Sequence, residues 1–243
     1  MSREWSRSER LLMRRALALA ERGRGRTRPN PVVGAVIARG GRVVAEGWHA
    51  RLGDRHAEVM ALERAGRRAR GATMFVTLEP CAHTGRTPPC VEALIGAGIR
   101  RCVVAVRDPH RIVDGRGLRR LRRAGIQVEL GLCAAEAREQ LAGYFSLHAR
   151  RRPRVTWKVG ASLDGRIADA RGRSRWITSA EARRYAHQLR ARADVVVVGA
   201  GTVAVDDPSL TARVPGVRRQ PLRLVCDPRL GLPLRRRLFR APL

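Results

Sequence analysis

The sequence predicts an α/β protein with two parts: a three-layer α/β/α domain over residues 1–148 and a partial α/β domain over residues 154–243. Short apolar runs alternate with segments of helical periodicity, which is typical of a sheet whose strands are joined by helices. Arginines and a proline interrupt this pattern at residues 149–153 and predict a linker there. The chain of 243 residues, 44% of them hydrophobic, is long enough to bury a core.

The first elements are a helix and a hairpin. Ser6 and Glu9 have the spacing of a capping box in front of a helix that carries apolar residues on one face, and Gly23 and Gly25 end it. The β-branched run 32–38 predicts a strand, Gly40 and Gly41 a tight turn, and residues 43–48 the returning strand.

The rest of the first part continues the alternation. Apolar spacing predicts a helix over residues 56–69, and residues 72–78 read as a buried strand. Pro88 and Pro89 precede a second helix with Cys90 in its first turn. The following pattern predicts a strand, a helix, a strand and a helix over residues 101–106, 118–124, 126–130 and 134–148.

The second part begins with a predicted strand over residues 155–161 and a turn over residues 162–165. A helix is expected over residues 179–192 and a fully apolar strand, of the kind found inside parallel sheets, over residues 194–199. Gly199 and Gly201 follow at once. They predict either a plain tight turn or a backbone that can approach a phosphate.

Three side chains have the chemistry of a metal site: His56, Cys81 and Cys90. One imidazole and two thiolates suit Zn²⁺, and three protein ligands leave a fourth position for water, as catalysis requires. Glu58 is well placed to take a proton from that water and pass it to a leaving amine. His56 and Glu58 also open a helix, whose N-terminus favours an anion.

Two other interpretations of these residues remain open. Cys81 and Cys90 can be a pair of buried thiols, although His56, Glu58 and Pro80 together argue against this. His83 has the spacing to supply a fourth ligand, which would make the zinc structural. The pattern H-x-E followed by Pro-Cys is typical of zinc-dependent nucleobase deaminases, which usually have two residues between their cysteines.

Here eight residues separate the cysteines, in the stretch TLEPCAHTGRTPPC over residues 77–90. This stretch resembles the deaminase half of the bifunctional riboflavin-biosynthesis deaminase/reductases. The resemblance implies a cytidine-deaminase-like fold and hydrolytic deamination of 2,5-diamino-6-ribosylamino-4(3H)-pyrimidinone 5′-phosphate. It also makes Asn30, otherwise a turn residue between two prolines, a candidate contact to the pyrimidine ring. In the loop over residues 108–117, His110 and Arg111 stand where this family has Asn and Pro.

The second part resembles the reductase half of the same family in the stretches KVGASLDG, SRWIT and GAGTVAVDDPSLTAR. That half is similar to dihydrofolate reductase in fold and uses NADPH to reduce a ribosyl group. The resemblance implies NADPH contacts from Gly160, Ala161, Trp176, Thr202 and Asp206. It implies substrate contacts from Lys158, Ser174, Arg190, Leu210 and Arg213, with the two arginines pairing with the 5′-phosphate.

A reductase domain of this type needs roughly 200 residues, an ordinary domain size. Only 91 residues run from Pro153 to Leu243, and the glycine-rich segment that grips NADPH phosphates in the family does not occur among them. We therefore expect either a truncated reductase half or a variant without reductase activity. A half-sheet with an unpaired edge would be unstable or prone to association.

The formal net charge is +29, from 50 Lys and Arg against 21 Asp and Glu. The arginines are spread over the whole chain, which favours simply solvated charges over a nucleic-acid surface. Such a charge would still attract a phosphorylated small substrate. The aromatic fraction of 4% argues against a surface that stacks bases.

Five cysteines without an export signal predict a reducing compartment, and Cys102, Cys133 and Cys226 are expected in the core. No apolar run is long enough to cross a membrane, so we expect a cytoplasmic protein. The resemblance implies a homo-oligomer. Two other functions stay open: a nucleic-acid deaminase of the tRNA-editing kind, and an arginine-rich binding protein that keeps a zinc fold as a scaffold.

Overall fold

The computed structural model describes residues 4–84, 88–174, 176–217 and 219–240. The chain divides into two compact units, Met1–Val155 and Thr156–Leu243, which are described separately.

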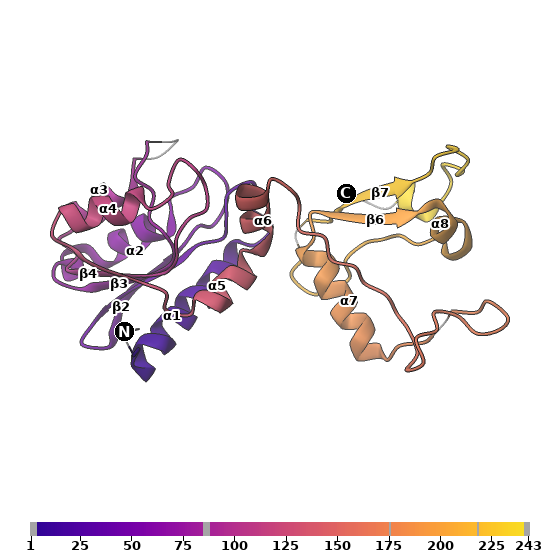
Figure 1. Ribbon diagram of the computed structural model, residues 1–243, viewed down its shortest axis with the longest axis horizontal. Helices are drawn as coiled ribbons and strands as arrows, with labels where there is room; N and C mark the ends of the chain where they lie inside the picture. The colour runs from indigo at the N-terminus through magenta and orange to yellow at the C-terminus, as the bar shows by residue number, and fades with distance from the viewer. Residues whose placement is uncertain (1–3, 85–87, 175, 218, 241–243) are drawn as a thin grey trace. The chain divides into compact units, whose positions relative to one another are not determined.

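The first unit is built on a five-stranded sheet with the strand order β2-β1-β3-β4-β5 (Figure 1). Its strands are β1 (Gly34–Arg39), β2 (Arg42–Trp48), β3 (Thr73–Leu78), β4 (Arg101–Val106) and β5 (Gln127–Leu130). The strands β1 and β2 form the predicted antiparallel hairpin around Gly40 and Gly41. By contrast, β3, β4 and β5 run parallel, so their C-terminal ends lie at the same edge of the sheet.

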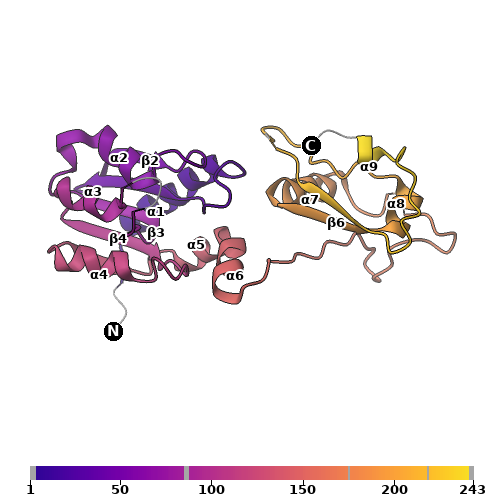
Figure 2. The same cartoon turned by 90° about the horizontal axis from the view of Figure 1, so that it is seen from above.

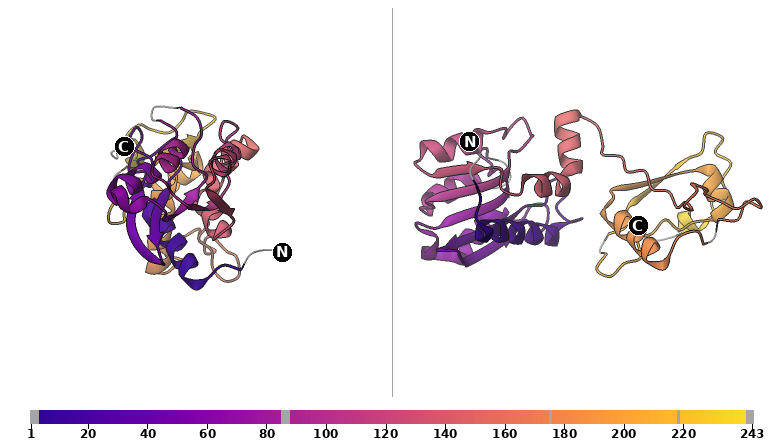
Figure 3. Two further views of the ribbon diagram at one scale, coloured as in Figure 1. Left: turned by 90° about the vertical axis from the view of Figure 1, so that its left-hand side faces the viewer. Right: turned by 60° about the horizontal axis from the view of Figure 1, so that its bottom comes forward.

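Helices cover both faces of this sheet and complete the predicted three layers (Figures 1 and 3). One core lies between the sheet and α2, α3 and α4, and the other lies between the sheet and α1 and α5. The helices are α1 (Arg7–Ala20), α2 (Ala57–Ala65), α3 (Cys90–Gly96), α4 (Arg116–Arg123), α5 (Ala134–Gln140) and α6 (Ala142–Arg150), with short 3-10 helices η1 (Glu21–Gly23) and η2 (Gly66–Ala69). The capping box is confirmed: Ser6 Oγ accepts from the Glu9 N–H, and Glu9 accepts from the Ser6 N–H.

Helix α1 lies directly against β1 because Gly34 has no side chain. A Cβ atom at Gly34 would lie 2.0 Å from the backbone oxygen of Ala16 and 2.8 Å from the backbone nitrogen of Ala20. The close packing of α1 on β1 therefore requires glycine at position 34, which the strand pattern alone does not explain.

An ion cluster joins the N-terminal helix to the last strand of the sheet. The guanidinium of Arg101 in β4 contacts Glu9 of α1 at 2.5 Å and Glu129 of β5 at 2.6 Å. All three side chains are largely buried, with exposed fractions of 12% to 17%. The cluster therefore links elements that are far apart in sequence.

The second unit contains α7 (Ala180–Arg192), β6 (Val195–Gly199), α8 (Ala200–Asp206), β7 (Leu222–Cys226) and α9 (Arg237–Arg240) (Figure 2). The strands β6 and β7 pair in parallel and form a two-stranded sheet. Buried side chains within this unit include Val203, Leu210, Ala212 and Leu238. The expected helix over residues 179–192 is present, with Ser179 as its N-cap.

Three predictions about elements were wrong in part. Residues 155–161 form no strand, and Val155 and Trp157 are more than 80% exposed, because no neighbouring strand supplies hydrogen bonds to this segment. The helix expected over residues 134–148 is two helices, since Leu141 leaves the helical conformation with φ −101° and ψ 14°. Finally, β6 is not buried on both faces: Val195 is 39% and Val197 57% exposed.

Two of the three cysteines that were expected in the core differ from expectation. Cys102 is fully buried in β4, as predicted. Cys133 is only partly buried at the start of α5. Cys226 is exposed in β7, because other elements do not fully cover either face of the two-stranded sheet. Among the described helices, none combines the length and the apolar character that crossing a membrane demands.

Candidate zinc centre and deamination site

Three segments that meet near the C-terminal end of β3 supply the candidate metal ligands. His56 is the N-cap residue of α2, and Cys90 is the first residue of α3. Cys81 follows β3 by three residues, and its backbone oxygen accepts from the Val91 N–H. The strand and two helix starts thus place the side chains predicted from the motif in one group.

The distances within this group are short. His56 Nδ1 lies 3.1 Å from Cys90 Sγ and 3.6 Å from Cys81 Sγ. The backbone N–H of Cys90 donates to Cys81 Sγ at 3.3 Å. Because both sulfur atoms approach Nδ1, this ring nitrogen is the one that faces the centre of the group.

These separations fit Zn²⁺. Tetrahedral zinc with bonds of about 2.0 Å to nitrogen and 2.3 Å to sulfur holds neighbouring donor atoms roughly 3.6 Å apart. His83 is exposed, and the described metal-ligand group consists of His56, Cys81 and Cys90 without it. The geometry therefore favours three protein ligands over the structural site with a fourth.

Glu58 lies in the first turn of α2, only 3% exposed. Burial raises the pKa of its carboxyl to about 7, and the nearby Cys81 thiolate adds to the increase. A carboxyl with this pKa can both accept and release a proton near neutral pH.

The side chains of Cys81 and Cys90 are hydrogen-bonded to each other. The Cys90 S–H donates to Cys81, which lowers the pKa of Cys81 and raises that of Cys90. The pKa of His56 is raised by its hydrogen bond to Cys81. Thiolates are the metal-binding form, so a bound divalent cation would take the place of the thiol protons.

A second histidine, His49, lies beside this group and was not predicted from the sequence. Its side chain is buried, and its ring meets that of His56 edge-on with centroids 5.3 Å apart. Nδ1 of His49 donates to the Arg55 carbonyl oxygen, so Nε2 accepts from the Asn30 amide at 3.3 Å. Burial lowers the pKa of His49 and favours this neutral form. Asn30, the predicted ring contact, is thereby oriented next to the metal ligands.

Glu79 is a further buried carboxylate that the motif contained but that received no role from the sequence. It is 4% exposed and accepts from four backbone N–H groups: those of Asp108 and Gly115 at one oxygen, and those of Gly117 and Leu118 at the other. A Cβ atom at Gly117 would lie 2.0 Å from the backbone oxygen of Pro80. The segment over residues 108–118 therefore lies directly against the two residues that precede Cys81.

The divergent residue His110 lies in the same segment. Its backbone N–H donates to Asp108, which is buried and also accepts from the Tyr144 hydroxyl at 3.0 Å. The rings of His110 and Tyr144 both lie 4.4 Å from that of His148. His110 thus packs against α6.

In the second unit, the two arginines expected at the phosphate lie around one histidine. Arg190 donates to the Thr211 carbonyl oxygen at 2.9 Å, and Arg213 donates to Ser209 Oγ at 3.1 Å. The Arg213 N–H donates to His187 Nδ1, while its Nη2 lies 3.2 Å from His187 Nε2. Burial, followed by the charge of Arg213, lowers the pKa of Arg190. This concentration of N–H donors suits an anion.

The other residues expected in the second unit lie on several segments. Lys158, Gly160 and Ala161 belong to the stretch that forms no strand, Ser174 is exposed, and Leu210 is buried. Thr202 and Asp206 are on α8, where Gly199 is the N-cap. Cβ atoms at Gly199 and Gly201 would meet no atom within 4 Å, so packing does not require these glycines, and space remains for a ligand.

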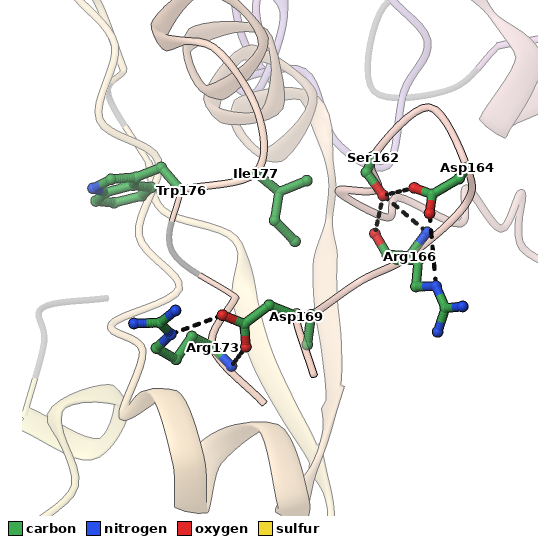
Figure 4. Close-up of a pocket in the computed structure, with 8 residues that line it drawn as sticks. Ser162, Asp164, Arg166, Asp169, Arg173, Trp176 and Ile177 are labelled. Atoms are coloured by element: carbon green, nitrogen blue, oxygen red, sulfur yellow. Dashed lines mark hydrogen bonds and ion pairs between the residues drawn. The ribbon is translucent and has the colours of Figure 1, made fainter. Parts of the chain in front are cut away.

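Trp176 lines an open pocket together with Ile177 and several polar side chains (Figure 4). Asp169 and Arg173 face each other across a 2.7 Å ion pair, and Ser162 donates to Asp164 at 2.5 Å. Of the predicted NADPH contacts, Trp176 alone lines this pocket. The tertiary structure therefore does not bring the five predicted contacts into that one pocket.

Comparisons with known proteins assign both units. Residues 6–106 match the family model of the cytidine and deoxycytidylate deaminase zinc-binding region, and residues 153–242 match that of the RibD C-terminal domain. The riboflavin biosynthesis protein RibD of Aquifex aeolicus is 50% identical over 222 residues, which are 91% of this chain and 62% of the relative. RibD of Escherichia coli K12 is 49% identical over 227 residues, which are 88% of this chain and 62% of the relative.

Solved structures agree with these relatives. Acinetobacter baumannii RibD matches with a TM-score of 0.88 and 43% identity over 97% of this chain and 67% of that chain. A deaminase/reductase of Thermotoga maritima matches with a TM-score of 0.84 and 43% identity over 90% of this chain and 63% of that chain. The chain thus spans about three fifths of the length of the curated relatives it matches. The His/Cys/Cys group lies within a match to a deaminase zinc-binding region, a RibD C-terminal domain follows it, and the chain belongs to the RibD family of riboflavin biosynthesis proteins.

Proposed function

We propose that the first unit hydrolytically deaminates a phosphorylated diaminopyrimidine, 2,5-diamino-6-ribosylamino-4(3H)-pyrimidinone 5′-phosphate. The observation that carries this proposal is the group of His56, Cys81 and Cys90 with the buried carboxyl of Glu58 beside it. The Thermotoga maritima relative is described as a diaminohydroxyphosphoribosylaminopyrimidine deaminase and a 5-amino-6-(5-phosphoribosylamino)uracil reductase, which supports the choice of substrate.

His56, Cys81 and Cys90 would hold Zn²⁺, which when bound supplies an acidified water as the nucleophile. Glu58 takes a proton from this nucleophile and delivers a proton to the departing amine nitrogen. A carbon–oxygen bond forms at the ring carbon, the carbon–nitrogen bond breaks, and ammonia leaves. The raised pKa of Glu58 supports both proton transfers by one group.

Asn30 and His49 would orient the pyrimidine ring. The Nδ1 hydrogen bond to Arg55 and the amide of Asn30 fix the tautomer and the plane of His49. A fixed pair of polar side chains next to the metal ligands suits a ring with alternating donors and acceptors, because little motion is lost on binding.

We propose that the second unit is the NADPH-dependent reductase half of the same protein. Gly160, Ala161, Trp176, Thr202 and Asp206 would contact NADPH, which supplies hydride when bound. Lys158, Ser174 and Leu210 would contact the substrate, and Arg190 and Arg213 would bind its 5′-phosphate. The donor-rich arrangement around His187 supports this phosphate site.

One assay tests both halves. Zinc-loaded protein is mixed with the diaminopyrimidine ribotide and NADPH, and ammonia release and NADPH oxidation are followed in the same sample. Ammonia release supports the deaminase, and NADPH oxidation that depends on this release supports the reductase. Absence of ammonia release from protein that contains one zinc per chain would contradict the proposed deaminase.

A further inference from the structure

The buried carboxylate of Glu79 holds the segment over residues 108–118 in place. Its two carboxylate oxygens accept from the backbone N–H groups of Asp108, Gly115, Gly117 and Leu118, at 2.9 to 3.3 Å. All four donors are main-chain groups. A carboxylate this deeply buried is stable only where such donors replace water, so the four bonds are a specific feature of the fold.

Glu79 also completes the N-terminus of α4. The N-cap residue, Gly115, has φ +80° and offers no side-chain cap. The first N–H groups of a helix otherwise lack partners, and the carboxylate of Glu79 accepts from those of Gly117 and Leu118. A negative charge is favoured at this end of a helix. The start of α4 is thus capped by a residue that directly follows β3.

The same contacts bear on the metal ligand Cys81. Strands β3 and β4 run parallel, so Glu79 and the segment over residues 108–118 leave the sheet at the same edge. Gly117 lies against the Pro80 carbonyl, with no room for a Cβ atom between them. Pro80 has a restricted φ and is bonded directly to Cys81. A shift of the segment toward Pro80 would therefore displace the backbone that carries the thiolate.

We propose that Glu79 is a positioning residue of the deamination site, which sets the place of Cys81 by fixing the segment over residues 108–118 against Pro80. The effect on turnover rests on the proposed deaminase function, whereas the effect on the metal site does not. Residues that orient metal ligands typically change metal affinity or activity by about 10- to 100-fold when they are replaced.

The substitution Glu79→Gln tests this with almost no change of shape. Glutamine keeps one acceptor oxygen but turns an NH₂ group toward two backbone N–H groups, so two of the four hydrogen bonds are replaced by donor–donor contacts. Glu92→Gln is the matched control, because Glu92 is an exposed carboxylate on α3 that pairs with Arg120 of α4. It makes the same chemical change beside the same helix.

Three measurements are made on the full chain: absorption bands of the Co²⁺-loaded protein, which report ligand geometry; amide hydrogen exchange at Gly115, Gly117 and Leu118; and kcat and KM for ammonia release from the zinc-loaded protein. In Glu79→Gln we expect shifted cobalt bands, faster exchange at the three amides, and kcat lowered by about 10- to 100-fold with KM changed less. Glu92→Gln should match the wild type in all three.

Unchanged cobalt bands together with unchanged kcat would overturn the proposal, even if the variant is less stable, because Glu79 would then support the fold alone. If the wild type itself releases no ammonia, the proposed function fails, and the cobalt bands still decide the role of Glu79. If Glu79→Gln does not fold, Gly115→Ala loosens the same segment with Glu79 intact, since alanine is strained at φ +80°. Wild-type cobalt bands in that variant would also overturn the proposal.

Discussion

The Nδ1 atom of His56 lies 3.1 Å from the Sγ atom of Cys90, although 34 residues separate them in sequence. Each residue begins a helix, and the two helices start at the same edge of the sheet as the C-terminal end of β3. The C-terminal end of β3 is thus the place where the two short motifs form one candidate metal site.

Cys90 should be a metal ligand, whereas Cys102 should be a core thiol. We expect Cys90→Ser to lower bound zinc well below one per chain and to abolish ammonia release, because two remaining ligands hold zinc weakly. Cys102→Ala should keep the zinc, since Cys102 is buried in β4, outside the group of ligands. Metal analysis of the purified proteins checks both. Zinc retained by Cys90→Ser would contradict this ligand assignment.

Glu58→Gln should separate chemistry from metal binding. The amide cannot move a proton as the carboxyl does, so kcat should fall by about 100-fold or more. Zinc content should remain that of the wild type, because His56, Cys81 and Cys90 are unchanged. Ammonia release and metal analysis on the same preparation test this. Loss of zinc in this variant would show that Glu58 is itself needed to hold the metal.

Arg101→Met should destabilise the first unit by about 3 kcal/mol, because it leaves the carboxylates of Glu9 and Glu129 largely buried without their shared cation. Arg154→Met is the control: its partner, Glu139, is exposed, so the change should be below about 1 kcal/mol. Urea unfolding of the two variants measures both values. Equal stabilities would contradict a structural role for the Arg101 cluster.

The same cluster predicts a pH dependence at the acidic end. Burial raises the pKa of Glu9, but hydrogen bonds from the Ser6 backbone and from Arg101 outweigh it and lower the pKa below its ordinary value of 4.5. The carboxylate of Glu9 therefore binds a proton more tightly in the unfolded chain than in the folded one. The stabilisation from Glu9 is complete above pH 4.5 and is lost as the pH falls through the lower, folded value. Unfolding free energies between pH 3 and 6, roughly the range of carboxyl titration, should show a shallower slope in Arg101→Met than in the wild type.

Replacement by alanine should lower the stability of the protein at Gly34 but not at Gly96. A Cβ atom at Gly34 would lie 2.0 Å from the Ala16 carbonyl oxygen, so Gly34→Ala must move α1 away from β1 and should cost about 3 kcal/mol. Gly96 lies in α3 with nothing within 4 Å of an added Cβ atom, so Gly96→Ala should be neutral or stabilising by up to about 1 kcal/mol. Thermal unfolding of the two variants measures the difference. A Gly34→Ala protein as stable as the wild type would show that the contact of α1 with β1 can relax.

Local patterns predicted the elements of the first unit well, since its strands and helices alternate with clear periodicity. The capping box, the hairpin at Gly40 and Gly41, and the helix that begins at Cys90 are all present. The clearest failure has a physical cause. Residues 155–161 have the composition of a strand, but a strand also needs a hydrogen-bonded neighbour, and the described sheet of the second unit contains β6 and β7 alone.

Residue types and spacing were enough to predict the candidate metal ligands and the candidate acid–base residue, because His56, Glu58, Cys81 and Cys90 stand in short stretches that suit zinc and proton transfer. The contacts of His49 and Glu79, by contrast, could be seen only in the folded chain. His49 contacts Asn30 at the open end of the β1–β2 hairpin, and Glu79 contacts backbone groups of residues 108–118, which follow the neighbouring strand β4. Contacts of this kind leave no periodic signal in the chain, because they depend on which strand ends lie side by side in the folded sheet.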